Sequence, residues 1–334
     1  MASISLLGKV KDIVDELGGL SSGRPYSGGT YSISKNGRYA FTYGNVYNPS
    51  DLATGYNGST NRLTQLNKDL FDYKKLGKVE EVWYNSSYDG RKIQGWLVTP
   101  PDFDSSKKYP LILEIHGGPF SNYGFRFSAE VQLFASKGYV VLYTNPRGST
   151  SYGKEFANLI HHNYPSEDYD DLMSGIDHVL KREYIDKNNL FVTGGSGGGV
   201  LTSWIVGKTN RFNAAVVAKP VINWYSFVLY ADNISYFYKY WFTGLPWDNV
   251  EEYMKRSPIS YVGNVKTPTM LLTGEKDYRT PMAESEQFYS GLKLNKVESM
   301  LVRIPGASHG IASRPSNLIA KVNAIIAWFE KYKK

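Results

Sequence analysis

Apolar residues follow different patterns along this chain, and the pattern changes near residue 78. Beyond that point, short and nearly continuous apolar runs predict buried strands at residues 111–115, 139–143, 190–193, 214–218, 270–273 and 300–304. Between these runs, apolar stripes at helical spacing predict helices, among them 171–180, 200–206 and 318–329. Buried strands that alternate with helices favour an α/β fold, in which a mostly parallel sheet is covered by helices on both faces.

Residues 1–78 are instead rich in Gly, Ser, Asn and Tyr, with short alternating runs. The pair Asn36-Gly37 lies between the runs 31–34 and 39–42 and predicts a β-hairpin, whereas residues 45–62 predict turns. A hairpin or two does not form a stable domain alone. We therefore expect a short β-rich segment at 1–78 that leans on an α/β domain at 79–334, or that is a fragment of a larger β structure.

The segment 224–253 interrupts the alternation with many aromatic residues. One interpretation is a helical excursion whose rings pack on the core. The other is a cap or pocket wall beside an active site, because ligand pockets are commonly lined with aromatic groups. In the second interpretation, Trp224 and Tyr225 are candidate substrate-binding residues.

The composition excludes several classes of protein. With 334 residues, of which 42% are hydrophobic and 21% charged, the chain has the balance of a folded globular protein. It contains no cysteine, which excludes a disulfide scaffold, a thiolate metal site and a cysteine nucleophile. The net charge of +7 comes from scattered residues, so we expect no nucleic-acid partner. We also expect no metal and no cofactor.

Membrane association is not expected either. No apolar run approaches the ~20 residues of a membrane span. The first residues lack the apolar core of a signal peptide, and this favours a cytoplasmic location.

The strongest chemical signal is the glycine-rich stretch 193–199, which contains the pattern G-x-S-x-G around Ser196. It follows a predicted strand and precedes a predicted helix, which is the context of a nucleophile elbow, the sharp turn that presents a catalytic serine. The spacing of the glycines does not fit the motifs of phosphate-binding loops. A dinucleotide-binding loop would need glycine where Val200 stands, and a P-loop ending at 207–209 would need glycine at Thr202.

A serine nucleophile needs a general base, and histidine suits neutral pH. In the α/β-hydrolase arrangement the chain order is serine, acid, histidine. His309 is the one histidine beyond Ser196, in a turn after the last predicted strand, so we expect it to be the base. The acid should follow the preceding strand, where Asp277 is our choice and Glu275 the alternative.

The negative oxygen formed during acyl transfer needs two backbone donors. One should be the N–H of Gly197, directly after the nucleophile. The other should come from the loop after an early strand, where the sequence His116-Gly117-Gly118-Pro119 makes the Gly118 N–H the candidate. We therefore expect Gly118 and Gly197 to form the oxyanion hole.

Five ordered segments give the chain a family resemblance. They read KKYPLILEIHGGPF, NPRGSTSYG, VTGGSGGG, GEKDYRTP and IPGASHG, from Lys107 to Gly310. Together they resemble the prolyl oligopeptidase family of serine peptidases, in particular its acylaminoacyl-peptidase and dipeptidyl-peptidase-like branch. The resemblance covers about residues 80–334 and implies an α/β-hydrolase domain that cleaves short peptides. It supports the roles of Ser196, Asp277, His309, Gly118 and Gly197.

The resemblance also bears on Arg279 and on the N-terminal segment. Arg279 matches a family position that can face the substrate pocket, although a structural salt bridge is equally compatible with it. Family members of this kind usually carry a whole N-terminal β-propeller, whereas residues 1–78 have room for only a blade or two. They resemble the end of a propeller, in a piece of a longer protein or a naturally short relative.

The sequence thus predicts a serine peptidase that acts on peptide or acyl-peptide substrates through an acyl-enzyme. An esterase of the same fold is the close alternative, and a non-catalytic α/β-hydrolase-like binding module is the alternative of another class. The open edge of an incomplete propeller would favour self-association into a homo-oligomer.

Overall fold

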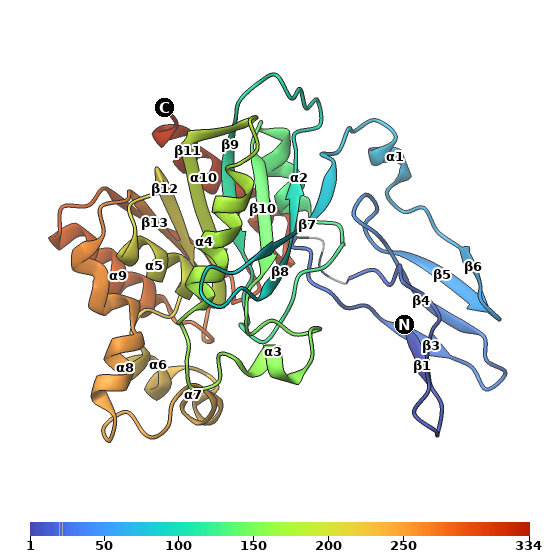
Figure 1. Ribbon diagram of the computed structural model, residues 1–334, viewed down its shortest axis with the longest axis horizontal. Helices are drawn as coiled ribbons and strands as arrows, with labels where there is room; N and C mark the ends of the chain where they lie inside the picture. Colours follow the sequence, from blue (N-terminus) through green and yellow to red (C-terminus); the bar gives the residue numbers. More distant parts are fainter. Residues whose placement is uncertain (20, 22) are drawn as a thin grey trace.

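The structure is a computed structural model that describes residues 1–19, 21 and 23–334. Within these residues an eight-stranded sheet forms the centre, in the order β14-β13-β12-β11-β9-β10-β8-β7 (Figure 1). The strands are β7 (Val79–Asn85), β8 (Lys92–Val98), β9 (Tyr109–Ile115), β10 (Val140–Asn145), β11 (Ile185–Gly195), β12 (Ala214–Ala218), β13 (Thr269–Gly274) and β14 (Ser299–Ile304). β8 pairs antiparallel with both β7 and β10, and all other neighbours are parallel. The predicted α/β fold with a mostly parallel sheet is confirmed.

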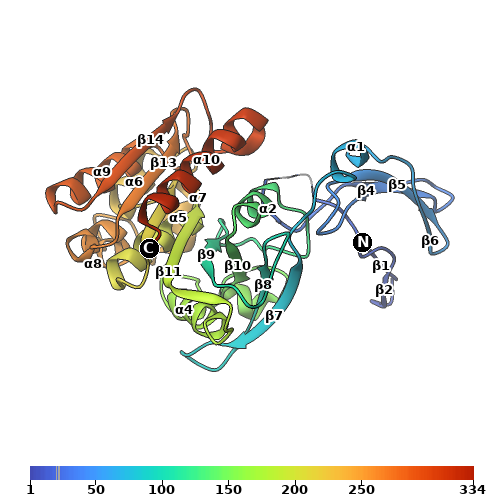
Figure 2. The same cartoon turned by 90° about the horizontal axis from the view of Figure 1, so that it is seen from above.

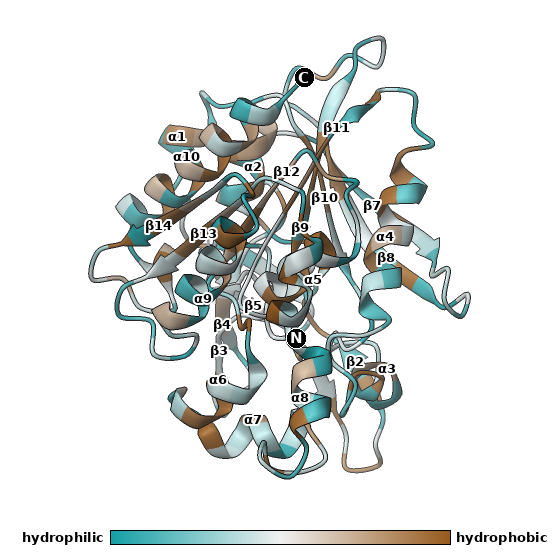
Figure 3. Ribbon diagram, turned by 90° about the vertical axis from the view of Figure 1, so that its left-hand side faces the viewer, coloured by the Kyte–Doolittle hydropathy of each residue, from teal (hydrophilic) through white to brown (hydrophobic). Residues whose placement is uncertain are grey.

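Helices cover both faces of this sheet. One face carries α2 (Ala129–Ser136) and α10 (Pro315–Tyr332), and the other carries α4 (Asp168–Val179), α5 (Gly197–Lys208) and α9 (Met282–Leu294). Successive residues of a strand point to opposite faces. In β9, for example, Leu113 packs in the core below α4 and α5, whereas Ile112 packs in the core below α2 and α10. Burial on both faces explains the continuous apolar runs, and Figure 3 shows the central strands as hydrophobic.

Smaller elements lie beyond the ends of the strands. They include α6 (Trp224–Tyr230), α7 (Ile234–Trp241), α8 (Val250–Arg256) and α3 (Lys154–Asn158), together with the 3-10 helices η1 (Pro258–Asn264) and η2 (Ile311–Ser313). The aromatic segment therefore folds into helices, which lie below the sheet in Figure 1. In the described ranges, no helix is both long enough and apolar enough to span a membrane.

The N-terminal β-rich part lies to one side of the sheet (Figure 2). It contains the pair β1 (Ala2–Ile4) and β2 (Val10–Asp12), the short helix α1 (Lys68–Phe71), and a four-stranded antiparallel sheet made of β3 (Tyr31–Ile33), β4 (Tyr39–Tyr43), β5 (Asp51–Tyr56) and β6 (Ser59–Arg62). The predicted hairpin at Asn36-Gly37 joins β3 to β4. A four-stranded antiparallel sheet is the unit of a β-propeller, and the origin of residues 1–78 in such a propeller stays a prediction.

The turns predicted at residues 45–62 are wrong for β5 and β6. The side of β5 that is buried carries Asp51, Ala53 and Gly55, so it has no large apolar residue to signal a strand. The burial of Asp51 is tolerated because its carboxylate accepts hydrogen bonds from the Arg62 side chain and from the Leu66 backbone N–H. These contacts across the turn are not visible in a hydrophobic pattern.

Arg147, in the turn after β10, connects three parts of the fold through its side chain. Its guanidinium donates to Asp171 in α4 at 2.7 and 2.9 Å, and to Ser86 and Asp89 in the β7–β8 turn at 3.2 Å. The Arg147 side chain is 3% exposed and that of Asp171 is fully buried. The motif NPRGSTSYG therefore has a structural reason to contain arginine, which forms bidentate contacts with a carboxylate.

We expect Arg147→Met to lower the free energy of unfolding by about 3–5 kcal/mol, because it leaves the Asp171 carboxylate buried without its charged partner. Urea unfolding measures the change. The control is Arg182→Met, which removes a partly exposed ion pair with Glu80 and should cost less than about 1 kcal/mol. If both variants lost the same free energy of unfolding, the burial of the Arg147–Asp171 pair would not contribute to stability as expected.

Candidate active site

Ser196 lies at the sharp turn between β11 and α5. Its backbone has φ 61° and ψ −121°, a strained conformation for a residue with a side chain. The flanking glycines are required by close packing. A Cβ on Gly194 would lie 2.4 Å from the Gly198 carbonyl oxygen, and one on Gly198 would lie 2.1 Å from the Ile115 carbonyl oxygen. The turn holds the serine hydroxyl at the carboxyl edge of the sheet.

The structure brings Ser196, His309 and Asp277 together in one hydrogen-bonded line. The Nε2 atom of His309 lies 3.0 Å from Ser196 Oγ, and its Nδ1 atom lies 2.8 Å from Asp277 Oδ2. The three residues follow β11, β13 and β14, which are parallel. The ends of parallel strands meet at one edge of a sheet, where α/β proteins bind their ligands.

Asp277 is held in place by further donors. It is 2% exposed, and its Oδ1 atom accepts the backbone N–H groups of Arg279 at 3.1 Å and Thr280 at 2.9 Å. The Thr280 hydroxyl donates to Oδ2 at 3.1 Å. The alternative acid, Glu275, is exposed and instead accepts the Gly306 N–H at 3.3 Å. Only Asp277 of the two lies against His309.

The environment of His309 favours its neutral form. Burial lowers the pKa of His309 below its usual 6.5, and the nearby charge of Lys219 lowers it further, whereas the hydrogen bond with Asp277 raises it. The net direction is downward. A neutral imidazole whose Nδ1–H points at Asp277 presents the lone pair of Nε2 to the serine hydroxyl.

The two expected oxyanion donors lie next to the nucleophile. A Cβ built on Gly197 would come within 3.0 Å of the Gly118 nitrogen, so the two amides are close neighbours. Gly118 has φ 138°, which favours glycine. Gly197 is the first residue of α5, where an N–H has no partner within the helix. Among the described residues neither N–H donates a hydrogen bond.

Sequence reasoning missed Tyr26, which contacts the oxyanion loop. Its hydroxyl accepts the N–H of Gly117 at 2.8 Å, from a position 91 residues earlier in the chain. An antiparallel β-bridge also joins the backbones of Tyr26 and Tyr123. No sequence signal marks this tyrosine, because it is one of 27 in the chain and lies in the β-rich segment.

An aromatic cavity of about 310 Å³ opens beside Ser196. Its wall includes residues of α6 and α7 and the loop after β13, namely Trp224, Phe227, Tyr236, Phe237, Trp241 and Arg279. The aromatic segment thus contributes both to the core and to a pocket wall. Both interpretations of Arg279, a pocket residue and a salt-bridged residue, hold in the structure. Arg279 lines this cavity and also pairs with Asp232 at 2.6 Å.

The structure does not place Tyr225 in this cavity, and we correct that prediction. Its ring packs against Tyr253, with ring centroids 6.4 Å apart. Adjacent residues of a helix point about 100° apart, so Trp224 and Phe227 face the cavity while Tyr225 faces away.

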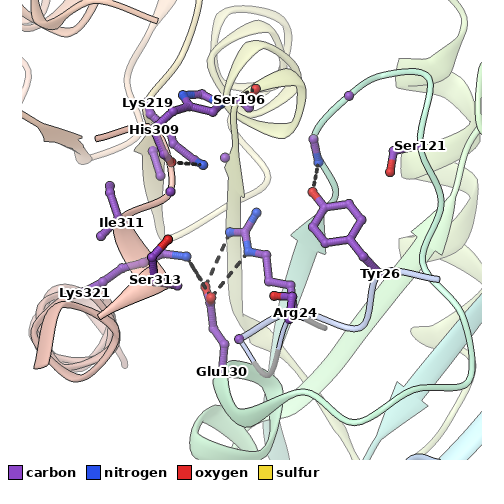
Figure 4. Close-up of a pocket in the computed structure, with 18 residues that line it drawn as sticks. Arg24, Tyr26, Ser121, Glu130, Ser196, Lys219, His309, Ile311, Ser313 and Lys321 are labelled. Atoms are coloured by element: carbon purple, nitrogen blue, oxygen red, sulfur yellow. Dashed lines mark hydrogen bonds and ion pairs between the residues drawn. The ribbon is translucent and has the colours of Figure 1, made fainter. Parts of the chain in front are cut away.

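A second cavity, of about 520 Å³, borders the same candidate catalytic residues and has a different lining. It shares Gly118, Ser196 and His309 with the aromatic cavity. Its other walls carry charged groups, Arg24, Glu130, Lys219 and Lys321 (Figure 4). Ser196 and His309 therefore lie between an aromatic space and a charged one.

Comparisons with known proteins show which family the chain resembles. A family model described as the prolyl oligopeptidase family matches residues 125–334. The uncharacterized peptidase YuxL of Bacillus subtilis is 42% identical over 275 residues, which are 81% of this chain and 42% of that protein. Dipeptidyl-peptidase 5 of Schizosaccharomyces pombe is 28% identical over 318 residues, which are 92% of this chain and 45% of that protein. The chain thus spans less than half the length of these curated relatives.

Solved structures extend the likeness to nearly the whole chain. The acylaminoacyl peptidase of Pyrococcus horikoshii superposes with a TM-score of 0.87 at 29% identity, over 98% of this chain and 52% of that one. An acylaminoacyl peptidase in complex with Z-Gly-Gly-Phe-chloromethyl ketone gives a TM-score of 0.88 at 29% identity, over 98% of this chain and 51% of that one. The predicted α/β-hydrolase fold and the predicted resemblance are confirmed. Since the family model matches more than half of its residues, the chain belongs to the prolyl oligopeptidase family.

Proposed function

We propose that this chain is a serine peptidase that hydrolyses short peptides or acyl-peptides through an acyl-enzyme. One observation carries the proposal: the continuous contact from Ser196 Oγ through the His309 imidazole to the buried Asp277 carboxylate. An alcohol becomes a nucleophile at neutral pH when a positioned base accepts its proton. The family and its peptidase members support the same reaction.

The reaction proceeds in two acyl transfers. Ser196 Oγ attacks the substrate carbonyl carbon while His309 Nε2 accepts the hydroxyl proton, and Asp277 stabilises the imidazolium. The N–H groups of Gly118 and Gly197 stabilise the negative oxygen. His309 then gives its proton to the leaving nitrogen, and the acyl-enzyme remains. A water molecule, deprotonated by His309, releases the acid and restores Ser196.

The aromatic cavity accommodates the side chain of the residue that contributes the scissile carbonyl. Trp224, Phe237 and Trp241 give it an apolar wall directly beside Ser196, and such walls bind aromatic or large apolar groups. The related acylaminoacyl peptidase was solved with an inhibitor that ends in phenylalanine, which suits such a cavity. Arg279, which also lines the cavity, would donate hydrogen bonds to the substrate backbone.

A fluorophosphonate probe tests the proposal directly. The wild type should be labelled on Ser196, and blocked and free short peptides should be cleaved, with products identified by mass spectrometry. Labelling without turnover of any peptide, but with turnover of a p-nitrophenyl ester, would indicate an esterase. A folded wild type that takes no label would indicate a non-catalytic binding module.

We expect kcat/KM to fall in acid with an apparent pKa below 6.5, because burial lowers the pKa of His309. Below that pKa the imidazole is protonated and cannot accept the Ser196 proton, and above it the base is available. Turnover of a p-nitrophenyl ester between about pH 4 and pH 8 measures the profile. A midpoint above the ordinary histidine value would contradict the burial argument.

A further inference from the structure

The charged cavity beside Ser196 has more cationic than anionic groups. Arg24, Lys219 and Lys321 line it, together with the carboxylate of Glu130. Glu114, which is fully buried, lies behind Arg24 and pairs with it at 2.9 Å. Lys321 pairs with Glu130 at 2.7 Å. Arg24 and Lys321 therefore each form an ion pair with one of the two carboxylates. Of the three cations that line the cavity, Lys219 remains without such an ion pair in the described part of the chain.

Lys219 is the cation without a carboxylate partner among the described residues that line this cavity. Its ammonium donates at 2.6 Å to the backbone carbonyl of His309, a neutral acceptor. Burial lowers the pKa of Lys219 to about 7, and the charges of Arg24 and Lys321 act in the same direction, whereas the more weakly acting carboxylates of Asp277 and Glu130 oppose this shift. A buried ammonium that lacks a counterion is costly. An anion bound in the cavity would remove this cost and restore the full charge of Lys219.

Arg24 and Lys219 converge on the residue that precedes the nucleophile. A Cβ built on Gly195 would lie 3.1 Å from Arg24 Nη1 and 3.2 Å from Lys219 Cε. Figure 4 shows the Arg24 guanidinium between Glu130 and Ser196, with Lys219 beside His309. A ligand held by these two cations therefore lies within one residue of the reacting serine.

The proposed function indicates which part of a substrate reaches this cavity. His309 must protonate the leaving nitrogen, so the leaving group lies within reach of His309, which lines both cavities. Lys219 contacts the His309 carbonyl, and Gly310 and Ile311 continue the same wall. The aromatic cavity, on the other side of Ser196, is occupied by the acyl part in the proposed function. The charged cavity is left for the leaving residue.

We propose that the charged cavity binds a carboxylate carried by the leaving residue of the substrate, held by Lys219 and Arg24. The inference rests on the proposed function and specifies its substrate class. Two sources of this carboxylate fit the short reach. One is the α-carboxylate of a C-terminal leaving residue, which is two bonds from the released nitrogen. The other is the side chain of a leaving aspartate, which is three bonds away.

Four matched peptides distinguish these sources. N-acetyl-Phe-Ala carries the α-carboxylate and N-acetyl-Phe-Ala-amide lacks it. N-acetyl-Phe-Asp-amide carries the side-chain carboxylate, and N-acetyl-Phe-Asn-amide is its neutral isostere. Because hydrogen bonds to charged groups are strong, we expect kcat/KM to be about tenfold to a hundredfold higher for a peptide with the favoured carboxylate than for its neutral counterpart.

Lys219→Met is the variant that tests the assignment. It should bring the ratio of charged to neutral substrate toward one, and Lys219→Arg should keep most of the preference. The ratio is the appropriate readout, because any disturbance of His309 affects both substrates. Lys266→Met, an exposed lysine before β13 at the opposite end of that strand, should leave the ratio unchanged. Arg24 is less suitable, since its removal leaves the buried Glu114 carboxylate without its ion-pair partner.

The outcomes separate this inference from the proposed function. If labelling by the fluorophosphonate is absent, the proposed function fails and the inference fails with it. If labelling occurs but neither carboxylate raises kcat/KM above that of its neutral counterpart, only the inference is overturned. Where turnover is too slow to follow, protection of Ser196 from labelling replaces it. Equal protection by charged and neutral peptides, or an unchanged preference in Lys219→Met, also overturns the inference.

Discussion

Replacing Ser196 by alanine is expected to lower kcat/KM for an acyl-peptide by a factor on the order of 10⁴ to 10⁶. The variant keeps the oxyanion donors and the binding cavities but has no atom that can form the acyl-enzyme. Residual turnover would come from attack by water. Active-site titration with a fluorophosphonate measures the loss of the reactive serine. Peptide turnover with the same preparation measures the remaining activity.

The matched control is Ser203→Ala, seven residues further along α5. The Ser203 hydroxyl is buried and donates only to backbone carbonyls of its own helix, at 2.9 and 2.8 Å. We expect this variant to keep its labelling and most of its activity. If Ser196→Ala retained wild-type turnover, the nucleophile would have to be another group, and the proposed function would be wrong.

Asp277→Asn should have the second largest effect, a fall in kcat on the order of 10⁴ with a small change in KM. The contacts of Asp277 determine how the amide is oriented. Oδ1 accepts the backbone N–H groups of Arg279 and Thr280, so the amide oxygen takes that position. The NH₂ group then faces Nδ1 of His309 and selects the tautomer that carries its proton on Nε2. That tautomer cannot accept the proton of Ser196.

The control for Asp277→Asn is Glu275→Gln, which makes the same change two residues earlier. Glu275 is exposed and contacts the Gly306 N–H instead of the imidazole, so its loss should change kcat less than about threefold. Steady-state kinetics of both variants on one substrate measure the contrast. An equal loss of kcat in the two variants would contradict the assignment of the acid.

The sequence determined much of the fold because its strands are buried on both faces. Apolar runs predicted β12 at residues 214–218, where the structure has it. Chain order and the ends of the strands pointed to Ser196 and His309 and limited the acid to Asp277 or Glu275, because parallel strands deliver their carboxyl ends to one edge. Antiparallel strands such as β5, which are built on small and polar residues, gave no such signal.

Only the tertiary structure decided how distant segments complete the site. Tyr26 contacts the oxyanion loop and Arg24 reaches the residue before the nucleophile, although both precede Ser196 by more than half of the chain. The rotation of α6 separated Trp224, which faces the cavity, from its neighbour Tyr225. Sequence patterns record the burial and the local turn of each element. They do not record which side chains of separate elements meet, because that depends on how the elements pack.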